Sequence, residues 1–550
     1  MDIFVISDFN ADLVSRYLSA DRTAPSSKAL ACPYGQLYQS LSAPPPMGSD
    51  SVVFVWTRPE GAISEWQSQL DGRPTQMEDL LAGVDLFCDA VVAQAGKCRL
   101  LLVASWLPSQ AGRGLGMLDW SPDGNASRLA QMNLRLAQRL SQVKNAFVLD
   151  AQKWIDAAQP ARDSKFWYLA KTPFTEGVHK AASADVKAAI RGVTGQTRKL
   201  IIVDLDDTLW GGIVGDDGWQ NLKIGGHDPI GEAHADFQRA LLSLNHRGIA
   251  LAVVSKNTES TALESIDQHP EMILRRKNFA GWRINWNDKA GNIVELVKEL
   301  NLGMQSVVFI DDNPAERGRV REALPDVLVP EWPKDPAHYA DAVRALNCFD
   351  QSTITAEDRG RAEMYASERS RRVSQTEFSS PQEWLRNLGI RVNVAPVTDI
   401  NRKRVVQLAN KTNQLNLATR RLTEEEFTAW LGREGHDARA LSVADRFGDI
   451  GLTGVISWRT DGDTLEIVDY ILSCRAMGRQ VEEFMLALAI EAAKEAGKSK
   501  VIARLLPTER NGPCLEFWRH SGFAETESNL FVWQTGQSYP APPFITLERT

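Results

Sequence analysis

Three short apolar runs, each ending in polar residues, most constrain how the middle of this 550-residue chain can fold. The runs are LIIVDLD at residues 200–206, IALAVVS at 249–255 and SVVFIDD at 306–312. Helical patterns separate them, and strands that alternate with helices predict a parallel, doubly wound α/β sheet. Ligands bind such sheets at the carboxyl ends of the strands. We therefore expect the polar residues that end these runs to meet at one edge of the sheet.

The chain is too long for one hydrophobic core and its length suggests about three domains. An N-terminal α/β domain is expected over 1–195, because four strand-like runs alternate with helical patterns there. These runs lie at residues 3–6, 52–56, 100–104 and 146–149. The middle α/β domain is expected over 198–349, and a polar helical linker over 350–373. The order of helices and strands over 374–550 predicts an α+β domain.

Composition and charge narrow the class of protein. The chain is 43% hydrophobic and 24% charged with a net charge of -8, and it has no long run of like charge. Six scattered cysteines without metal-ligand spacing indicate reduced thiols in the cytosol. The first apolar run is too short for a signal peptide, and no stretch approaches the roughly 18 apolar residues that span a bilayer. We therefore expect a cytoplasmic protein with no nucleic-acid or membrane partner.

The residues at the strand ends suit phosphoryl transfer. Asp204 and Asp206 are two residues apart, so their side chains can enter one pocket. One ionised carboxylate could attack phosphorus while the other protonates the leaving oxygen and later activates water. Ser255 and Lys289 can neutralise charge on the phosphate. The adjacent Asp311 and Asp312 offer the hard oxygen ligands that suit Mg²⁺.

The insertion after LIIVDLD leaves room for a hairpin flap but not for a large cap domain. A weakly capped site can accept a bulky or carrier-tethered substrate. Within GGHDP at residues 225–229, His227 is a candidate substrate ligand, and a structural turn histidine is the alternative because Gly-Gly and Asp-Pro mark turns. Further candidates for substrate contact are Thr208, Lys256 and Asn257.

The order of these motifs resembles the haloacid dehalogenase superfamily over the whole middle block. The resemblance implies that Asp204 is the nucleophile and Asp206 the general acid and base. It also implies a Mg²⁺ site, with candidate ligands Asp204, Asp206, Asp311 and Asp312. Since four motifs arrive in the expected order, we favour this interpretation over isolated solvated acids or helix caps.

Longer strings in the middle and last blocks resemble the FkbH-like subfamily. They are DLDDTLWGGIVGDDG, GGHDPIGE, VVSKN, INWNDKAGNI, FIDDNPAER, LANKTNQLNLATRR and LSCRAMGRQVE. The resemblance implies an acyltransferase built on a phosphatase fold. Such proteins take 1,3-bisphosphoglycerate, remove phosphate and load a glyceryl group onto the phosphopantetheine thiol of an acyl carrier protein in polyketide-type metabolism.

The last block also resembles Gcn5-related acyltransferases. Arg475, Gly478 and Gln480 lie where that family's pyrophosphate-binding loop opens a long helix, and a helix N-terminus favours anions. Gln480 replaces the usual small residue, which argues against ordinary coenzyme A binding. Cys474 is the candidate thiol nucleophile, and a small buried hydrophobe is the alternative.

Amide and cationic side chains gather before this loop. This surface suits a phosphoglyceryl group or an acidic carrier protein, and a solvated helix face is the alternative for the outer cations. The candidate ligands are Asn410, Asn413, Gln414 and Arg475, beside Asn416, Arg402, Lys403, Arg404, Lys411, Arg420 and Arg421.

The first block is the least informative. Ser7, Glu176 and His179 faintly resemble the SGNH hydrolase arrangement, but the Gly-Asp-Ser string is missing, so an accessory or docking role is favoured over hydrolysis. Two other functions remain open for the whole chain. One is a plain small-molecule phosphatase with accessory domains, which would need neither Cys474 nor the amides. The other is a docking scaffold with an inactive site, against which the complete acidic set argues.

Overall fold

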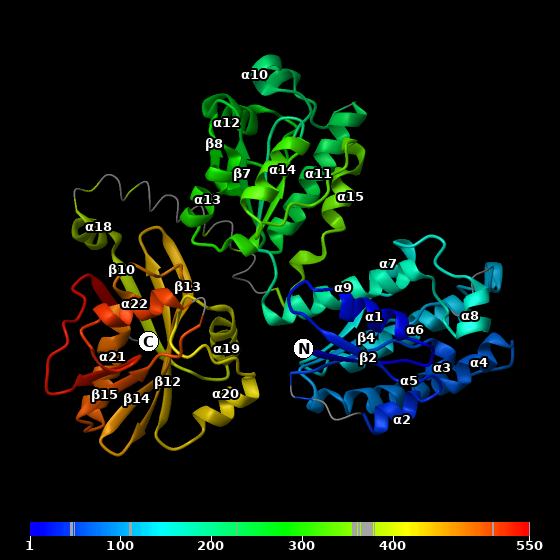
Figure 1. Cartoon of the computed structure of the whole chain (residues 1–550), viewed down its shortest axis with the longest axis horizontal. Helices are drawn as coiled ribbons and strands as arrows, with labels where there is room; N and C mark the ends of the chain where they lie inside the picture. The colour runs from blue at the N-terminus through cyan, green and yellow to red at the C-terminus, as the bar shows by residue number, and fades with distance from the viewer. Residues whose placement is uncertain are drawn as a thin grey trace. The chain divides into compact units, whose positions relative to one another are not determined.

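A computed structural model gives the fold of the chain (Figure 1). It describes residues 1–44, 48, 50–108, 113–226, 228–354, 360, 364, 374, 378, 380–508 and 511–548. They form two compact units, Met1–Thr197 with Leu346–Thr353, and Arg198–Ala345 with Ile354–Thr550. Within this described part, no helix combines the length and the apolar character needed to cross a membrane. The expected helical linker over 350–373 lies mostly outside the described residues.

The first unit is a five-stranded parallel sheet between two layers of helices. In sheet order the strands are β2 (Lys28–Ala31), β1 (Asp2–Ile6), β3 (Val52–Val55), β4 (Leu100–Ala104) and β5 (Ala146–Leu149). Successive side chains of a strand point to opposite faces, so strands covered on both sides need continuous apolar runs. This need explains why β1, β3, β4 and β5 were visible in the sequence, and the predicted parallel sheet is confirmed.

Each face of this sheet has its own core. Phe4 and Ile6 point into a core formed with α2 (Leu37–Ser42), α4 (Ser64–Leu70), α5 (Met77–Val92) and α6 (Asn125–Leu140). Ile3 and Val5 point into the opposite core, formed with α1 (Asp12–Ala20), α7 (Gln152–Asp156) and α9 (Glu176–Thr194). Two short helices, α3 (Pro59–Ala62) and α8 (Ser164–Ala170), complete the unit.

The segment Leu346–Thr353 belongs to the first unit, whereas the predicted middle domain extended to residue 349. Its short helix η7 (Asn347–Phe349) contacts α9. Arg191 of α9 donates a hydrogen bond to Asn347 at 3.4 Å. Phe349 is buried, so the burial of one apolar side chain fixes a boundary that composition did not reveal.

The first sheet of the second unit has four parallel strands. In sheet order they are β8 (Phe279–Ile284), β7 (Ala250–Ser255), β6 (Leu200–Val203) and β9 (Val307–Ile310). Side chains of α13 (Lys289–Glu299) and α14 (Pro314–Ala323) share one core with this sheet. The other helices here are α11 (Pro229–His246), α12 (Glu259–Gln268) and α15 (Tyr339–Arg344).

The insertion between β6 and α11 is small. It contains the short helix α10 (Val214–Asp217) and an antiparallel bridge between Gly211 and Lys223. The amide of Gly225 donates to the carbonyl of Gly231 at 2.6 Å, which closes the base of the insertion. The insertion is therefore a flap rather than a domain.

The second sheet of this unit is mainly antiparallel, as the α+β prediction required. In sheet order the strands are β16 (Ala524–Glu527), β17 (Leu530–Gln534), β15 (Lys500–Arg504), β14 (Thr464–Leu472), β13 (Gly448–Asp461), β12 (His436–Asp445), β10 (Ile390–Pro396) and β18 (Ile545–Glu548), and β11 (Leu415–Asn416) pairs with β14. Side chains of α18 (Pro381–Leu388), α21 (Val481–Glu495) and α22 (Gly512–His520) join the core on one face. On the other face lie α19 (Arg402–Lys411) and α20 (Glu424–Leu431).

Candidate active site

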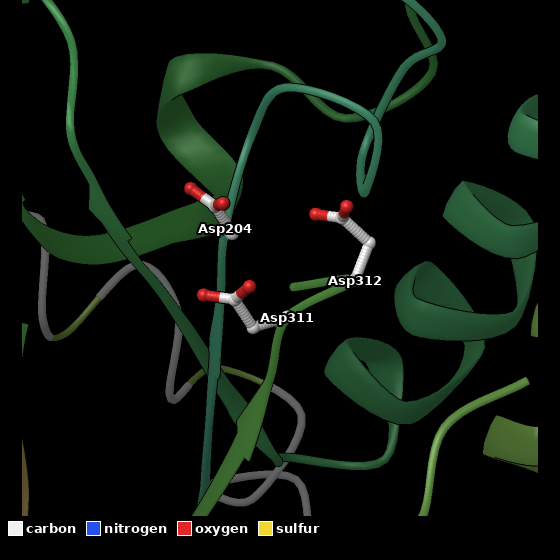
Figure 2. Close-up of side chains that lie close together, drawn as sticks. All are labelled: Asp204, Asp311 and Asp312. Atoms are coloured by element: carbon white, nitrogen blue, oxygen red, sulfur yellow. The ribbon is translucent and has the colours of Figure 1, made fainter. Parts of the chain in front are cut away.

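Three carboxylates meet at the carboxyl ends of β6 and β9. Val203 and Ile310 are partners in the parallel pair, so Asp204 and Asp311 leave the sheet side by side. Asp204, Asp311 and Asp312 each offer an oxygen, and these oxygens lie within 4.8 Å of one another (Figure 2). The sequence prediction that these acids converge agrees with this geometry.

Lys289 brings one positive charge to the cluster. It is the first residue of α13, and its Nζ donates to Asp204 Oδ2 at 2.8 Å and to Asp311 Oδ2 at 2.7 Å. Only 3% of the residue is exposed. Burial alone would lower the pKa of Lys289, but Asp204 and Asp311 outweigh it and hold this pKa above the usual value. Lys289 is therefore a charged bridge between two acids.

The arrangement fits a divalent cation. Asp204 Oδ1 is buried and has no hydrogen-bond partner among the described residues. Burial raises the pKa of both Asp311 and Asp312, and the charge of Asp204 raises them further. One lysine leaves the three acids with an excess of negative charge, and carboxylate oxygens are the ligands that Mg²⁺ prefers. Asp204, Asp311 and Asp312 could hold Mg²⁺, which would neutralise charge on a phosphoryl group.

Asp206 occupies a different environment from the three acids. Its Oδ1 accepts from Trp210 Nε1 at 2.9 Å and from the Val214 amide at 3.1 Å, and its Oδ2 accepts from Asn257 at 2.9 Å. Burial raises the pKa of Asp206, and the bonds from Val214 and Trp210 oppose the shift. Its side chain lies outside the cluster of Asp204, Asp311 and Asp312, and its hydrogen bonds suit a general acid and base, while its role as a metal ligand stays a prediction.

Most of the other residues predicted to contact substrate in this domain lie at the same edge of the sheet, and several of them hydrogen-bond to other side chains of the chain. Ser255 ends β7 and is buried at the same edge of the sheet. Thr208, predicted to touch substrate, instead exchanges two 3.0 Å hydrogen bonds with the carboxylate and the amide of Asp312. Lys256 pairs with Glu316 at 2.6 Å rather than remaining free for a ligand.

Asn257 was also predicted to touch substrate, and it positions Asp206 instead. His227, the candidate ligand in the flap, lies outside the described residues. The roles of Thr208 and Asn257 could not be read from spacing, because each depends on a partner far away in sequence.

Two supporting residues were not found from the sequence. The indole of Trp210 orients Asp206, and the guanidinium of Arg317 donates to the backbone carbonyls of Asp311 and Asp312 at 2.8 and 2.6 Å. Both lie inside strings already recognised, DLDDTLWGG and FIDDNPAER. The sequence signal that could have identified them is their spacing, because Trp210 and Arg317 each lie within a few residues of paired acids.

Cys474 lies in the turn 474–480, between β14 and α21. It is partly exposed, whereas the other five cysteines are buried. The neighbouring guanidinium of Arg475 donates to Ser473 Oγ at 3.2 Å and to the carbonyl of Ile450 at 3.5 Å. Cys474 is therefore the least buried of the cysteines, and Arg475 is held by neighbouring polar atoms.

The amide of Gly478, in the turn before α21, is not free for an anion. The amide of Gly478 donates to Glu482 Oε1 at 2.6 Å, and Gln480 has a left-handed backbone with φ of 62°. Burial raises the pKa of Glu482 to about 7, although the amide bonds lower it. The side chain of Glu482 thus already accepts the hydrogen bond of the Gly478 amide, two residues before Gln480, which replaces the usual small residue.

The predicted amide cluster is only partly assembled. Asn410 donates to the carbonyl of Leu422 at 2.9 Å, while its Oδ1 is buried without a partner among the described residues. Asn410 lines a pocket with Arg420 and Asp469. Asn413 accepts a bond from Arg421, and Gln414 is half-buried beside β11. Asn410 is the member that combines a buried acceptor without a partner among the described residues with a place in the lining of a pocket.

Ser7, Glu176 and His179 do not form a catalytic triad. Ser7 Oγ accepts from the amide of Phe9 at 3.1 Å, and Glu176 binds Tyr17 and Lys180 at the surface. Neither nitrogen of the buried His179 has a hydrogen-bond partner among the described residues. The three side chains therefore make no hydrogen bonds to one another, and an accessory or docking role for this domain stays a prediction.

Comparison with known proteins finds similar solved structures. The N-terminal part of a Bacteroides fragilis protein, which contains a phosphatase domain complexed with Mg, is 26% identical with a TM-score of 0.58, over 64% of this chain and 94% of that chain. An acetyltransferase of the GNAT family from Staphylococcus aureus is 11% identical with a TM-score of 0.21, over 26% and 99%. No family model and no curated protein matches. The chain thus shares its fold, over nearly two thirds of its length, with a protein that contains a phosphatase domain.

Proposed function

We propose that the edge of the four-stranded sheet is a Mg²⁺-dependent phosphoryl-transfer site of the haloacid dehalogenase type. The observation that carries this proposal is the buried, unpartnered oxygen of Asp204 beside Asp311, Asp312 and Lys289. The solved relative that contains a phosphatase domain was crystallised with Mg, which supports the same assignment.

The residues divide the chemistry between them. Asp204 attacks phosphorus, and the bond from phosphorus to the leaving oxygen breaks as an aspartyl-phosphate forms. Asp206, fixed by Trp210 and Asn257, protonates the leaving oxygen and then takes a proton from the water that hydrolyses the intermediate. Lys289 and the hydroxyl of Ser255 stabilise charge on the phosphoryl oxygens.

We further propose that the chain is a glyceryl transferase that uses 1,3-bisphosphoglycerate and a phosphopantetheinylated acyl carrier protein in the cytoplasm. The FkbH-like strings in the middle and last blocks and the partial exposure of Cys474 support this proposal. The thiolate of Cys474 attacks the acyl phosphate, a carbon–sulfur bond forms and phosphate leaves with the electron pair. The Asp204 site removes the other phosphate, which is an ester.

The carrier thiol then displaces Cys474 by thioester exchange, a step that needs no further energy source. Asn410 is the best-placed group to bind a hydroxyl of the acyl chain, since its Oδ1 has no partner among the described residues and the residue lines a pocket with Arg420. The alternative function is a Mg²⁺-dependent small-molecule phosphatase with accessory domains. It is favoured by the relative that contains a phosphatase domain and needs no accessible thiol.

Intact-mass analysis after incubation with 1,3-bisphosphoglycerate separates the two functions. Without carrier, the wild type should gain a hydroxylamine-labile adduct that maps to the peptide containing Cys474. Cys474→Ala should lack the adduct and fail to load the carrier, whereas the control Cys98→Ala should behave as wild type. Asp204→Asn should retain its fold and form no dephosphorylated glyceryl adduct. Phosphate release without any adduct would identify a plain phosphatase.

A further inference from the structure

A pocket lies at the carboxyl edge of the sheet in the first unit, and none of its lining residues belongs to the phosphoryl-transfer site. It is lined by residues that follow β3 and β4, among them Trp56, Thr57, Arg58 and Ser105. Ligands of open α/β sheets bind outside the carboxyl ends of the strands. Its place at this edge therefore makes the pocket a candidate ligand site.

The wall of the pocket combines aromatic rings with hydroxyl groups. The rings of Trp56 and Phe174 stack with centroids 5.2 Å apart and an interplanar angle of 8°. Thr57 Oγ1 accepts from Trp106 at 3.0 Å, and Ser105 Oγ accepts from the amide of Ala151 at 3.0 Å. Each hydroxyl still has its own proton to donate. The pocket thus offers an apolar surface and two donors.

Two guanidinium groups line the pocket, and they differ in their partners. Arg58 is neutralised, because it binds Asp8 at 2.8 Å and Glu60 at 3.1 Å, and it lies 3.9 Å from the ring centroid of Trp167. Arg162 lies 5.4 Å from the ring centroid of Phe174. Among the described residues, no carboxylate forms an ion pair with Arg162.

Arg162 is therefore a partly buried cation without a counter-charge. Burial lowers the pKa of Arg162, and the more distant charge of Glu60 opposes this shift. A guanidinium presents paired N–H donors that match the two oxygens of a carboxylate or phosphate. An oxyanion in the pocket would supply the missing partner.

We propose that this pocket binds a small organic oxyanion through Arg162, with the body of the ligand against Trp56 and Phe174. Ser7 is fully buried and does not line the pocket, so the pocket binds the ligand without hydrolysing it. This site is independent of the phosphoryl-transfer site.

Calorimetric titration of the full chain tests the proposal with two phenyl probes, benzoate and phenylphosphonate, in excess chelator. Either probe should bind the wild type, and the one that binds more tightly identifies the ligand's oxyanion. Arg162→Gln should weaken that binding about 10-fold or more, since it removes a charge-assisted pair of hydrogen bonds. Arg162→Lys keeps the charge but loses the paired N–H donors, so its affinity for the probe should lie between those of the wild type and Arg162→Gln.

Arg73→Gln is the matched control, because Arg73 lies in the same unit with 68% of its side chain exposed. It should bind both probes as the wild type does, and Arg162→Gln should release phosphate at the wild-type rate. The proposal is overturned if neither probe binds the wild type. It is also overturned if the affinities survive unchanged in both Arg162 variants, because any binding would then belong to the phosphoryl-transfer site.

Discussion

Replacing Lys289 by methionine removes the ammonium that lies between Asp204 and Asp311 and keeps the length of the side chain. Each contact, at 2.8 and 2.7 Å, corresponds to about 6 kcal/mol of attraction at an effective dielectric constant of about 20. Most of this attraction offsets the cost of burying the lysine. Removing one partner of a buried ion pair still costs about 3–5 kcal/mol, because the acids stay buried without compensation. We therefore expect Lys289→Met to lower the local stability of this sheet by about 3–5 kcal/mol when a chelator removes divalent cations.

Lys256 provides the matched comparison at the same edge of the sheet. It pairs with Glu316 at 2.6 Å, but 39% of its side chain is exposed. Exposed pairs contribute about 0–1 kcal/mol, so Lys256→Met should destabilise this sheet little. The two substitutions remove the same charge and differ in burial.

Excess Mg²⁺ should restore much of the loss in Lys289→Met, because a divalent cation can neutralise the acids that the lysine leaves. A ligand at about 100 times its Kd adds about 2.7 kcal/mol to the stability of the state that binds it. Hydrogen exchange of peptides from β6 and β9 reports this local stability without requiring the whole chain to unfold in one step. Equal protection in Lys289→Met and Lys256→Met, or no response of Lys289→Met to Mg²⁺, would refute the reasoning.

Three further outcomes are expected. Thr208→Val removes both hydrogen bonds to Asp312 and should weaken Mg²⁺ activation of phosphate release by about 10–100-fold; an unchanged Mg²⁺ titration would contradict this. Burial lowers the pKa of His179 from 6.5 to about 4, so the unfolded chain takes up the proton first as pH falls. Acidification through this range should cost the first unit up to about 3 kcal/mol, and His179→Phe should abolish that part of the pH dependence of thermal unfolding. In Gly61→Ala the new Cβ would lie 2.0 Å from Asp8 Oδ2, so urea unfolding should show a loss of about 1–3 kcal/mol, and wild-type stability would argue against a rigid Asp8.

The sequence predicted the strands that are continuous apolar runs and missed two edge strands, β2 and β8. β6, β7 and β9 are such runs, and β9 was recognised although it lies at an edge of its sheet, whereas β2 reads KALA and alternates between exposed and half-buried residues. The edge strand β8 contains a glycine and an arginine, which weaken its pattern. Local pattern therefore recovers a strand when its apolar run is continuous, whether the strand lies at the centre or at an edge of the sheet.

The acidic cluster was predictable because each member follows a recognisable strand. The environment of Asp206 was not predictable, because it depends on Asn257, which follows a different strand. The same holds for Thr208, whose partner Asp312 is more than 100 positions away. Spacing places a side chain at an edge, and only the fold decides which neighbour it meets.

The bond between Gly478 and Glu482 bears on how a transferase chooses among acceptors that look alike. Coenzyme A carries the same pantetheine arm as a carrier protein, and it differs by a pyrophosphate-bearing nucleotide. At the start of α21 the Gly478 amide is already bound to Glu482, whichever protonation state that acid adopts. A pyrophosphate approaching this turn would have to displace Glu482 from the Gly478 amide and would meet a second acid, Glu483, in the first turn of α21. On the proposed function, the turn would then disfavour coenzyme A, which carries a pyrophosphate, relative to a carrier protein.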